Sequence, residues 1–427
     1  MRRREDMSLK NENNQNNLTQ KRWLVLIASC LINLCIGAMY AWSVFAAPLA
    51  AHLSELLGAT ITAADLSIVF SVGNGGGFIT MIAGGFLNKK IGPKWVIFIG
   101  GILFGSGFIV CGLANSIFML ILGFGIMSGL AMGLAYGQTI SNSVKFFPDK
   151  AGLVGGIATA SYGISSVIIP PVANKLINIF GVSKAFLILG IAIVVIVGIF
   201  SQFIIKCPEG FKPDGWKGSN EKVQESQENI DKTWKEMLKM PVFYVMIIML
   251  FFGAVFGMMA ISQASGIAQN MIGMAPAQAA IVVSVLALFN TCGRIVAGYV
   301  SDRIGCINTL TIVFVIAIIS MGLLYFSSSS LVIMFYIGIC LTGVCFGAFM
   351  GVYPGFTASQ FGSKNSGVNY GIMFMGFSSA GVVGPMIVSK VYNSTGDYRF
   401  AFLIAIVFAI IGMALSFVYR KVSEKSK

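Results

Sequence analysis

The chain has 427 residues, of which 56% are hydrophobic and only 11% are charged, whereas about a quarter of residues in soluble domains are charged. This composition excludes a soluble globular enzyme, and we expect no enzymatic activity. The 50 glycines and 22 methionines are typical of membrane helices, where small residues let neighbours approach closely. The net charge of +13 does not indicate nucleic-acid binding, because the basic residues form no patch and mark scattered loops.

Apolar runs long enough to cross a bilayer as helices follow one another along the chain. The first is too long for a signal peptide and lacks a small-residue cleavage pattern, so we expect it to be retained. Six runs precede a polar segment and six follow it. The sequence therefore predicts an all-α membrane protein with 12 transmembrane helices in two pseudo-symmetric six-helix bundles. The runs lie at about 23–50, 61–87, 94–114, 117–144, 151–176, 185–206, 241–267, 276–300, 307–326, 330–356, 365–391 and 398–419.

These runs divide the chain into five parts. We expect a polar tail at 1–22, a first bundle at 23–206, a linker at 207–240, a second bundle at 241–419 and a tail at 420–427. The charged linker is typical of a solvated segment, with a short surface helix near Trp234.

Lysine and arginine are distributed unequally between the two sides of the predicted bundle. If both termini lie on one side, most of the 29 basic residues lie there too, and only Lys175, Lys184, Lys390 and Arg399 lie opposite. By the positive-inside rule, both termini and the linker are cytoplasmic in a multi-pass protein of the cytoplasmic membrane.

The two halves repeat the same features at a nearly constant offset. A loop motif that begins at Gly85 and includes Lys89 and Gly92 follows the second run, and its counterpart, Gly298 to Gly305 with Asp302 and Arg303, follows the eighth. The fourth and tenth runs carry glycine at every fourth position, which favours close helix packing over a role in ligand binding. These features indicate parallel duplication of a six-helix unit. The glycines are Gly125, Gly129, Gly133 and Gly137, and Gly343, Gly347, Gly351 and Gly355.

Arg294 is the basic residue that lies inside an apolar run, about 12 Å from the boundary marked by Asp302. A guanidinium at that depth costs a few kcal/mol, so it should face the bundle interior and meet an anion or acceptors there. Pairing with Asp302 by snorkelling is the structural alternative. No Asp, Glu or His is embedded deep within an apolar run, so we favour a substrate carboxylate as the counter-ion. Asn290, one turn earlier, is placed to orient the guanidinium or to bind substrate.

The remaining chemistry of the sequence is sparse. Eight cysteines include no CxxC pair and the chain has one histidine, His52, so we expect no metal and no cofactor. Aromatic residues within the runs are as consistent with packing as with lining a small polar cavity around Arg294. The candidates for the cavity are Tyr40, Tyr136, Tyr162, Phe346 and Phe377.

Several segments resemble the major facilitator superfamily, and within it the oxalate:formate antiporter family, in a form similar to monocarboxylate transporters. The loop motifs after the second and eighth runs resemble those of the superfamily. The segments that resemble the antiporter family are Gly37-Ala-Met-Tyr40-Ala-Trp42-Ser43, Tyr136-Gly137, Phe146-Phe-Pro-Asp-Lys150-Ala-Gly152, Tyr162-Gly163, Gly293-Arg294, Tyr353-Pro354 and Asn369-Tyr370-Gly371. The resemblance implies a central cavity that opens alternately to each side, with Arg294 as the carboxylate-binding arginine and Tyr40, Tyr136 and Tyr162 in its wall.

Two departures from this family bear on the substrate and on the gate. Oxalate-transporting members pair the arginine with a lysine on the eleventh helix, where this sequence has Phe377. One guanidinium neutralises one carboxylate, and an unpaired second carboxylate in an apolar cavity would cost several kcal/mol. In the loop motif, Lys89 replaces the acidic residue that Asp302 keeps in the second half.

The sequence therefore predicts a secondary carrier of a small monocarboxylate such as pyruvate, lactate or formate, functional as a monomer within the lipid bilayer. A co-transported proton and a counter-transported carboxylate both remain open as the coupled species. The alternatives are a dicarboxylate:formate exchanger and a membrane sensor that binds the anion, although the linker shows no recognisable output domain.

Overall fold

The computed structural model describes residues 2–62, 65–213 and 231–425, and over these ranges the chain is helical and contains no strand. Within them, 11 helices are long and apolar enough to cross a membrane. The longest, Ile68–Gly112, covers both the second and the third predicted runs.

Two glycines explain this difference in number. Gly92 (φ 81°, ψ 164°) breaks the longest helix in the middle, and Gly305 (φ 85°, ψ 150°) separates the equivalent pair of helices in the second half. Both conformations lie where side chains are disfavoured and glycine is not. Dividing the longest helix at Gly92 gives the 12 predicted crossings.

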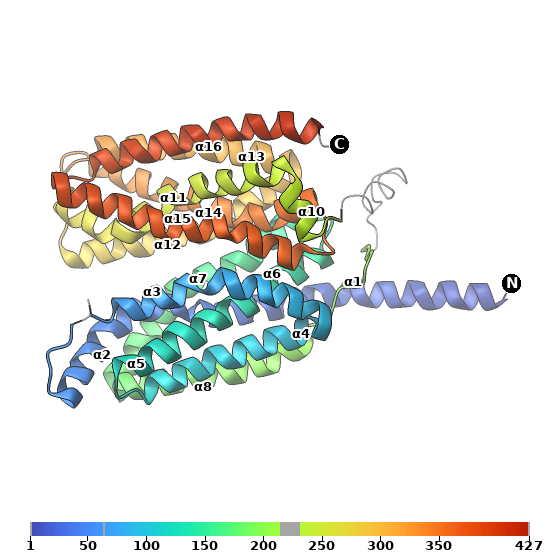
Figure 1. Cartoon of the computed structure of the whole chain (residues 1–427), viewed down its shortest axis with the longest axis horizontal. Coiled ribbons are helices and arrows are strands. Elements are labelled where there is room, and N and C mark those ends of the chain that lie inside the picture. Colours follow the sequence, from blue (N-terminus) through green and yellow to red (C-terminus); the bar gives the residue numbers. More distant parts are fainter. Residues whose placement is uncertain (1, 63–64, 214–230, 426–427) are drawn as a thin grey trace.

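The first half of the chain forms one bundle, the lower one in Figure 1. Its first crossing is interrupted by a turn of 3-10 helix, and its fourth contains a π-helical stretch. Its elements are α1 (Arg2–Ile36), η1 (Gly37–Ala41), α2 (Trp42–Leu57), α3 (Ser67–Gly75), α4 (Gly77–Gly112), α5 (Ile117–Leu120), η2 (Ile121–Ser128), α6 (Gly129–Phe146), α7 (Ala151–Phe180), α8 (Val182–Phe200) and η3 (Ser201–Phe203).

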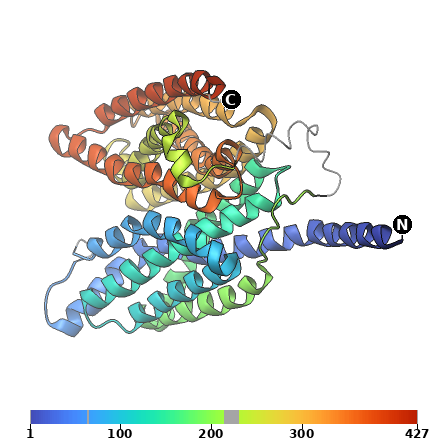
Figure 2. The ribbon, with the colours of Figure 1, turned by 45° about the vertical axis from the view of Figure 1, so that its right-hand side comes forward.

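The second half forms the upper bundle, and Figure 2 shows the same division from another side. The bundles meet where α7 packs on α12 and α14, and where α4 packs on α15. Both termini lie at one end of the molecule (Figure 1). The predicted polar tail is helical from Arg2 and forms the first part of α1. The elements are α10 (Trp234–Lys239), α11 (Pro241–Asn270), α12 (Pro276–Ile304), α13 (Cys306–Phe326), α14 (Val332–Phe361), α15 (Ser366–Thr395) and α16 (Arg399–Lys425).

The glycine ladders serve helix packing, as the spacing predicts. On α6, a Cβ at Gly129 or Gly133 would collide with the backbone of α3 and α4. On α14, a Cβ at Gly347 would collide with the Asn290 carbonyl, and one at Gly351 with the Arg294 carbonyl. The second ladder therefore holds α14 directly against the stretch of α12 that carries the buried arginine.

The C-terminal part of the linker is bound to the second bundle. The predicted short helix is confirmed as α10, which begins with a capping box between Thr233 and Glu236. The Lys232 carbonyl accepts hydrogen bonds from the side chains of Asn365 (3.1 Å) and Asn369 (3.0 Å) at the start of α15. The linker residues 214–230 lie outside the described residues.

Candidate functional site

Arg294 lies on α12 at its contact with α7, and its side chain is only 2% exposed. Its Nε donates a hydrogen bond to Oδ1 of Asn290, one turn earlier on α12 (3.2 Å). Its Nη1 donates to the backbone carbonyl of Thr159 on α7 (2.6 Å). The guanidinium is thus oriented by its own helix and bonded to the opposite half of the molecule.

No carboxylate neutralises this guanidinium among the described residues. The ion pairs found there join Arg22 to Asp149, Lys364 to Glu209 and Arg399 to Asp397. Asp302, the alternative partner, instead accepts hydrogen bonds from the backbone N–H groups of Gly152 (2.7 Å) and Leu153 (2.8 Å). Arg294 is therefore a buried cation held by neutral acceptors.

Gly163 makes room for the guanidinium on the surface of α7. A Cβ at this position would lie 3.3 Å from both Cζ and Nε of Arg294 and 3.2 Å from the Thr291 hydroxyl. These separations are tighter than ordinary van der Waals contact between carbon atoms, at about 3.5–4.0 Å. Glycine at 163 therefore allows the arginine to pack closely against the neighbouring helix.

Aromatic side chains from both halves continue from the arginine as a chain of ring contacts. The phenol of Tyr136 interacts with the Arg294 guanidinium. The rings link η1, α7 and α6 of the first half to α15 and α14 of the second. The centroid separations are Tyr40–Tyr162 5.2 Å, Tyr136–Tyr162 4.8 Å, Tyr136–Phe374 6.3 Å, Phe374–Phe377 4.7 Å and Phe346–Phe377 6.0 Å.

The structure thus brings all seven candidate residues into one connected region, with different exposures. Arg294, Asn290, Tyr136, Tyr162 and Phe346 are buried, Phe377 is half-buried, and Tyr40 is 37% exposed. The sequence did not single out the Thr159 carbonyl, which accepts from Arg294, or Phe374 and Tyr370, whose rings lie 6.0 Å apart. The four-residue spacing of Tyr370 and Phe374 on one helix face was the available signal for those two.

The loop motifs join the two halves at the end of the molecule that carries the termini. Lys89 donates from Nζ to Oδ1 of Asn365 across the halves (2.7 Å), so it has a partner although the usual acid is missing. A Cβ at Gly85 would meet the backbone of Val368 at 2.7 Å. Arg303 lies over the Tyr299 ring on its own helix, 4.5 Å from the centroid.

Away from these loops, some residues of α12 and α15 are more exposed. On α12, Thr291 and Ser301 lie against α7 and are buried, whereas Ser284, nearer the start of the helix, is exposed. On α15, Phe374 is buried, whereas Val382 is 60% and Met386 65% exposed. Several of the contacts between the halves lie at the loop-motif end.

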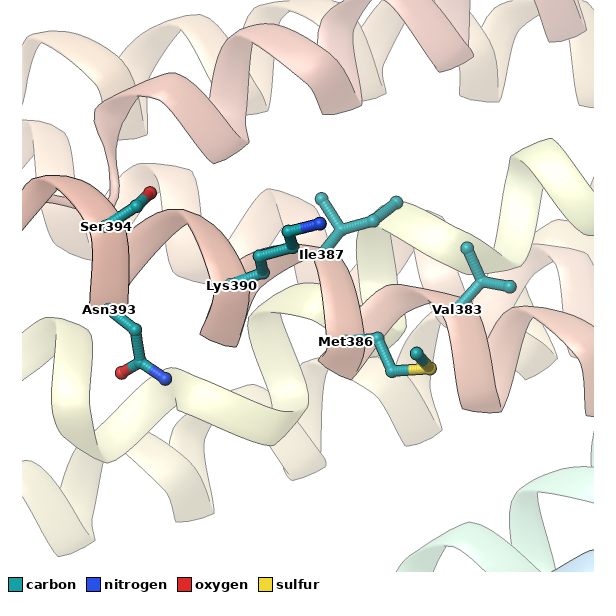
Figure 3. A pocket seen from close by; sticks show the side chains of 6 residues that line it. All are labelled: Val383, Met386, Ile387, Lys390, Asn393 and Ser394. Atoms are coloured by element: carbon teal, nitrogen blue, oxygen red, sulfur yellow. The ribbon is translucent and has the colours of Figure 1, made fainter.

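A pocket with a volume of 640 Å³ lies along the far part of α15, apart from the arginine. Figure 3 shows apolar side chains along one stretch of this helix and polar ones along the next. Its lining residues are Val383, Met386, Ile387, Lys390, Asn393 and Ser394. None of them is a candidate site residue.

The family model described as Major Facilitator Superfamily matches residues 29–385 and 273–427. The chain belongs to this superfamily. It is therefore a multi-pass membrane transporter and not an enzyme. Its resemblance to the oxalate:formate antiporter and monocarboxylate transporter groups is supported by similar proteins at low identity.

Three similar proteins cover most of the chain. An uncharacterized MFS-type transporter, YhjX, of Escherichia coli is 30% identical over 84% of this chain and 86% of its own length. The oxalate:formate antiporter of Oxalobacter formigenes is 27% identical over 93% of this chain and 91% of its own. Monocarboxylate transporter 12 of Rattus norvegicus is 25% identical over 81% and 75%.

Solved structures of two superfamily members share the fold. The proton:xylose symporter XylE superposes with a TM-score of 0.70 at 14% identity, covering 93% of this chain and 95% of that chain. The transporter FucP superposes with a TM-score of 0.66 at 16% identity, covering 93% and 99%. These likenesses confirm the predicted fold class.

Proposed function

We propose that this transporter is a secondary active carrier of a small monocarboxylate of the pyruvate, lactate or formate type, with the carboxylate bound by Arg294. The observation that carries the proposal is the buried guanidinium with no acidic partner among the described residues. A buried charge without a counter-ion is costly, and a substrate carboxylate would offset that cost while using the paired donors of the guanidinium.

The single cation favours one carboxylate over two. Phe377 lies between the rings of Phe346 and Phe374 and offers no charge to a second carboxylate. The names of the similar proteins support transport of carboxylates: one is an oxalate:formate antiporter and another a monocarboxylate transporter. The first of these names also keeps dicarboxylate exchange as the second candidate.

The proposed transport cycle is alternating access by rocking of the two bundles about the arginine. We place the loop motifs on the cytoplasmic side, as the excess of lysine and arginine there supports, so the contacts at that end would close the carrier toward the cytoplasm. The contacts of Lys89 with Asn365 and of Asp302 with α7 would have to part for the opposite state.

The test is uptake of labelled pyruvate, lactate, formate and oxalate into proteoliposomes that contain wild type, Arg294→Ala or Arg420→Ala. Arg420 is an exposed arginine bonded to Asn308 at the end of α16 and serves as the matched control. We expect uptake of a monocarboxylate that Arg294→Ala abolishes and Arg420→Ala preserves. A pH gradient and internal carboxylate, applied separately, would distinguish proton symport from exchange.

Two results would contradict the proposal. Faster uptake of oxalate than of every monocarboxylate would favour the dicarboxylate exchanger and refute the one-cation argument. Binding of a carboxylate without uptake under any gradient would favour the sensor.

A further inference from the structure

Tyr370 carries a hydroxyl that none of the contacts around Arg294 uses. Tyr370 lies on α15 and its side chain is 2% exposed. Among the described residues, it is the one tyrosine whose hydroxyl is completely buried without a hydrogen-bond partner. A buried hydroxyl without a partner costs free energy, so native proteins rarely keep one unless it serves another purpose.

The Tyr370 ring extends the chain of aromatic rings at the arginine site. The Tyr370 ring packs edge-on against Phe374, with centroids 6.0 Å apart, and Phe374 contacts Tyr136. Tyr370 also lies within range of electrostatic interaction with Tyr136 and Arg294. Tyr370 on α15 is therefore joined to the arginine site through the rings of Phe374 and Tyr136.

The two donors suit different oxygens of one ligand. A planar guanidinium pairs best with the two oxygens of a carboxylate. A neutral hydroxyl beside it suits a neutral oxygen, such as the carbonyl or hydroxyl group on the carbon next to the carboxyl carbon. Because a site that hydrogen-bonds such a group leaves its own polar atom unpaired when the group is missing, it discriminates strongly against the simpler analogue.

We propose that the Tyr370 hydroxyl binds an oxygen on the carbon next to the substrate carboxyl group, so that the site selects 2-oxo and 2-hydroxy monocarboxylates over unsubstituted acids. This inference rests on the proposed function and narrows its substrate class. The proposed contact comes from the second half, because Tyr370 lies on α15, which packs against α4 and α6.

The test compares Tyr370→Phe with wild type for lactate, pyruvate and propionate, because propionate has the same three-carbon skeleton without the extra oxygen. We expect wild type to prefer lactate or pyruvate to propionate by at least about tenfold in KM. Tyr370→Phe keeps the ring contact with Phe374 and should lose that preference, through a higher KM for lactate and pyruvate and an unchanged KM for propionate.

A second measurement separates this role from a structural one. Removing an unpartnered buried hydroxyl should leave the Tm of the ligand-free protein unchanged or raise it. The matched control is Tyr353→Phe, because the buried Tyr353 hydroxyl donates to the Met246 carbonyl (2.8 Å) and its loss should lower the Tm without changing the preference.

The outcomes are distinct. Equal changes for lactate and propionate, or no change for either, would overturn the assignment, as would a fall in Tm as large as that of Tyr353→Phe. Failure of the proposed function looks different: wild type would then transport none of the three acids, and Arg294→Ala would match it.

Discussion

Replacing Arg294 with lysine isolates the geometry of the guanidinium from its charge. In the structure, Nε and Nη1 are occupied by Asn290 and Thr159, and these bonds fix the plane in which the remaining donors lie. Lysine presents all its donors from one nitrogen, so it cannot hold both acceptors and also present two parallel donors to a carboxylate.

The size of the effect follows from the lost bond. A hydrogen bond to a charged group contributes about 1.5–3 kcal/mol. Loss of one of the two parallel bonds to the carboxylate would therefore raise KM for the transported monocarboxylate about 10- to 150-fold. Arg294→Lys should keep part of the activity that Arg294→Ala loses, because the charge remains.

The assay is initial uptake into proteoliposomes over a range of substrate concentrations, normalised to the amount of inserted protein. Arg420→Lys is the control, because Arg420 is exposed and far along α16. A KM for Arg294→Lys within about twofold of wild type would refute two-pronged binding and leave only a charge requirement at this position.

Three further substitutions test neighbouring parts of the argument. Phe377→Lys, which adds a second cation beside the Phe346 and Phe374 rings, should shift the preference of uptake competition toward oxalate; unchanged selectivity would count against the one-cation argument. Gly163→Val should displace the guanidinium from α7 and raise KM. The control Gly198→Val should leave KM unchanged, because a Cβ at Gly198 meets open space. Similar KM values for the two variants would show that the close fit at Gly163 has no effect. Asp302→Ala removes two charge-assisted bonds to α7 and should widen spin-label distances between the halves at the loop-motif end. The control Asp397→Ala should leave these distances unchanged, because Asp397 pairs with Arg399, two residues away in the same half.

The sequence predicts the fold well where a repeat or a long apolar run carries the signal. The pairing of Gly92 with Gly305 in the repeated loop motif locates the break that divides the longest helix. The 3-10 turn at Gly37–Ala41 was not predictable from hydropathy, because the run is apolar on both sides of it. There, Gly37 packs against the Tyr162 carbonyl and Ser165, a contact between helices far apart in sequence.

In the site as well, some groups could be predicted from the sequence and others could not. Arg294 stands out in the sequence because an unpaired cation in an apolar run requires an explanation. The Thr159 carbonyl does not, since a backbone acceptor is present at every residue and only the packing of α7 on α12 selects one of them. Tyr370 stands out in the sequence only as part of the motif Asn369-Tyr370-Gly371, because its burial and lack of a partner depend on how α15 packs in the fold.

The bond from Arg294 to Thr159 suggests how binding and movement are coupled in the proposed cycle. Its two ends lie on different halves, so any rocking that separates α7 from α12 at this level breaks it. A bound carboxylate supplies acceptors that replace the lost carbonyl, which lowers the cost of breaking the bond at the moment of movement. Without substrate, the same movement would leave a buried guanidinium with one acceptor fewer, at a cost of about 1.5–3 kcal/mol. A carrier built in this way favours movement when loaded and resists it when empty, as an exchanger requires, whereas a symporter must also return to its first state empty.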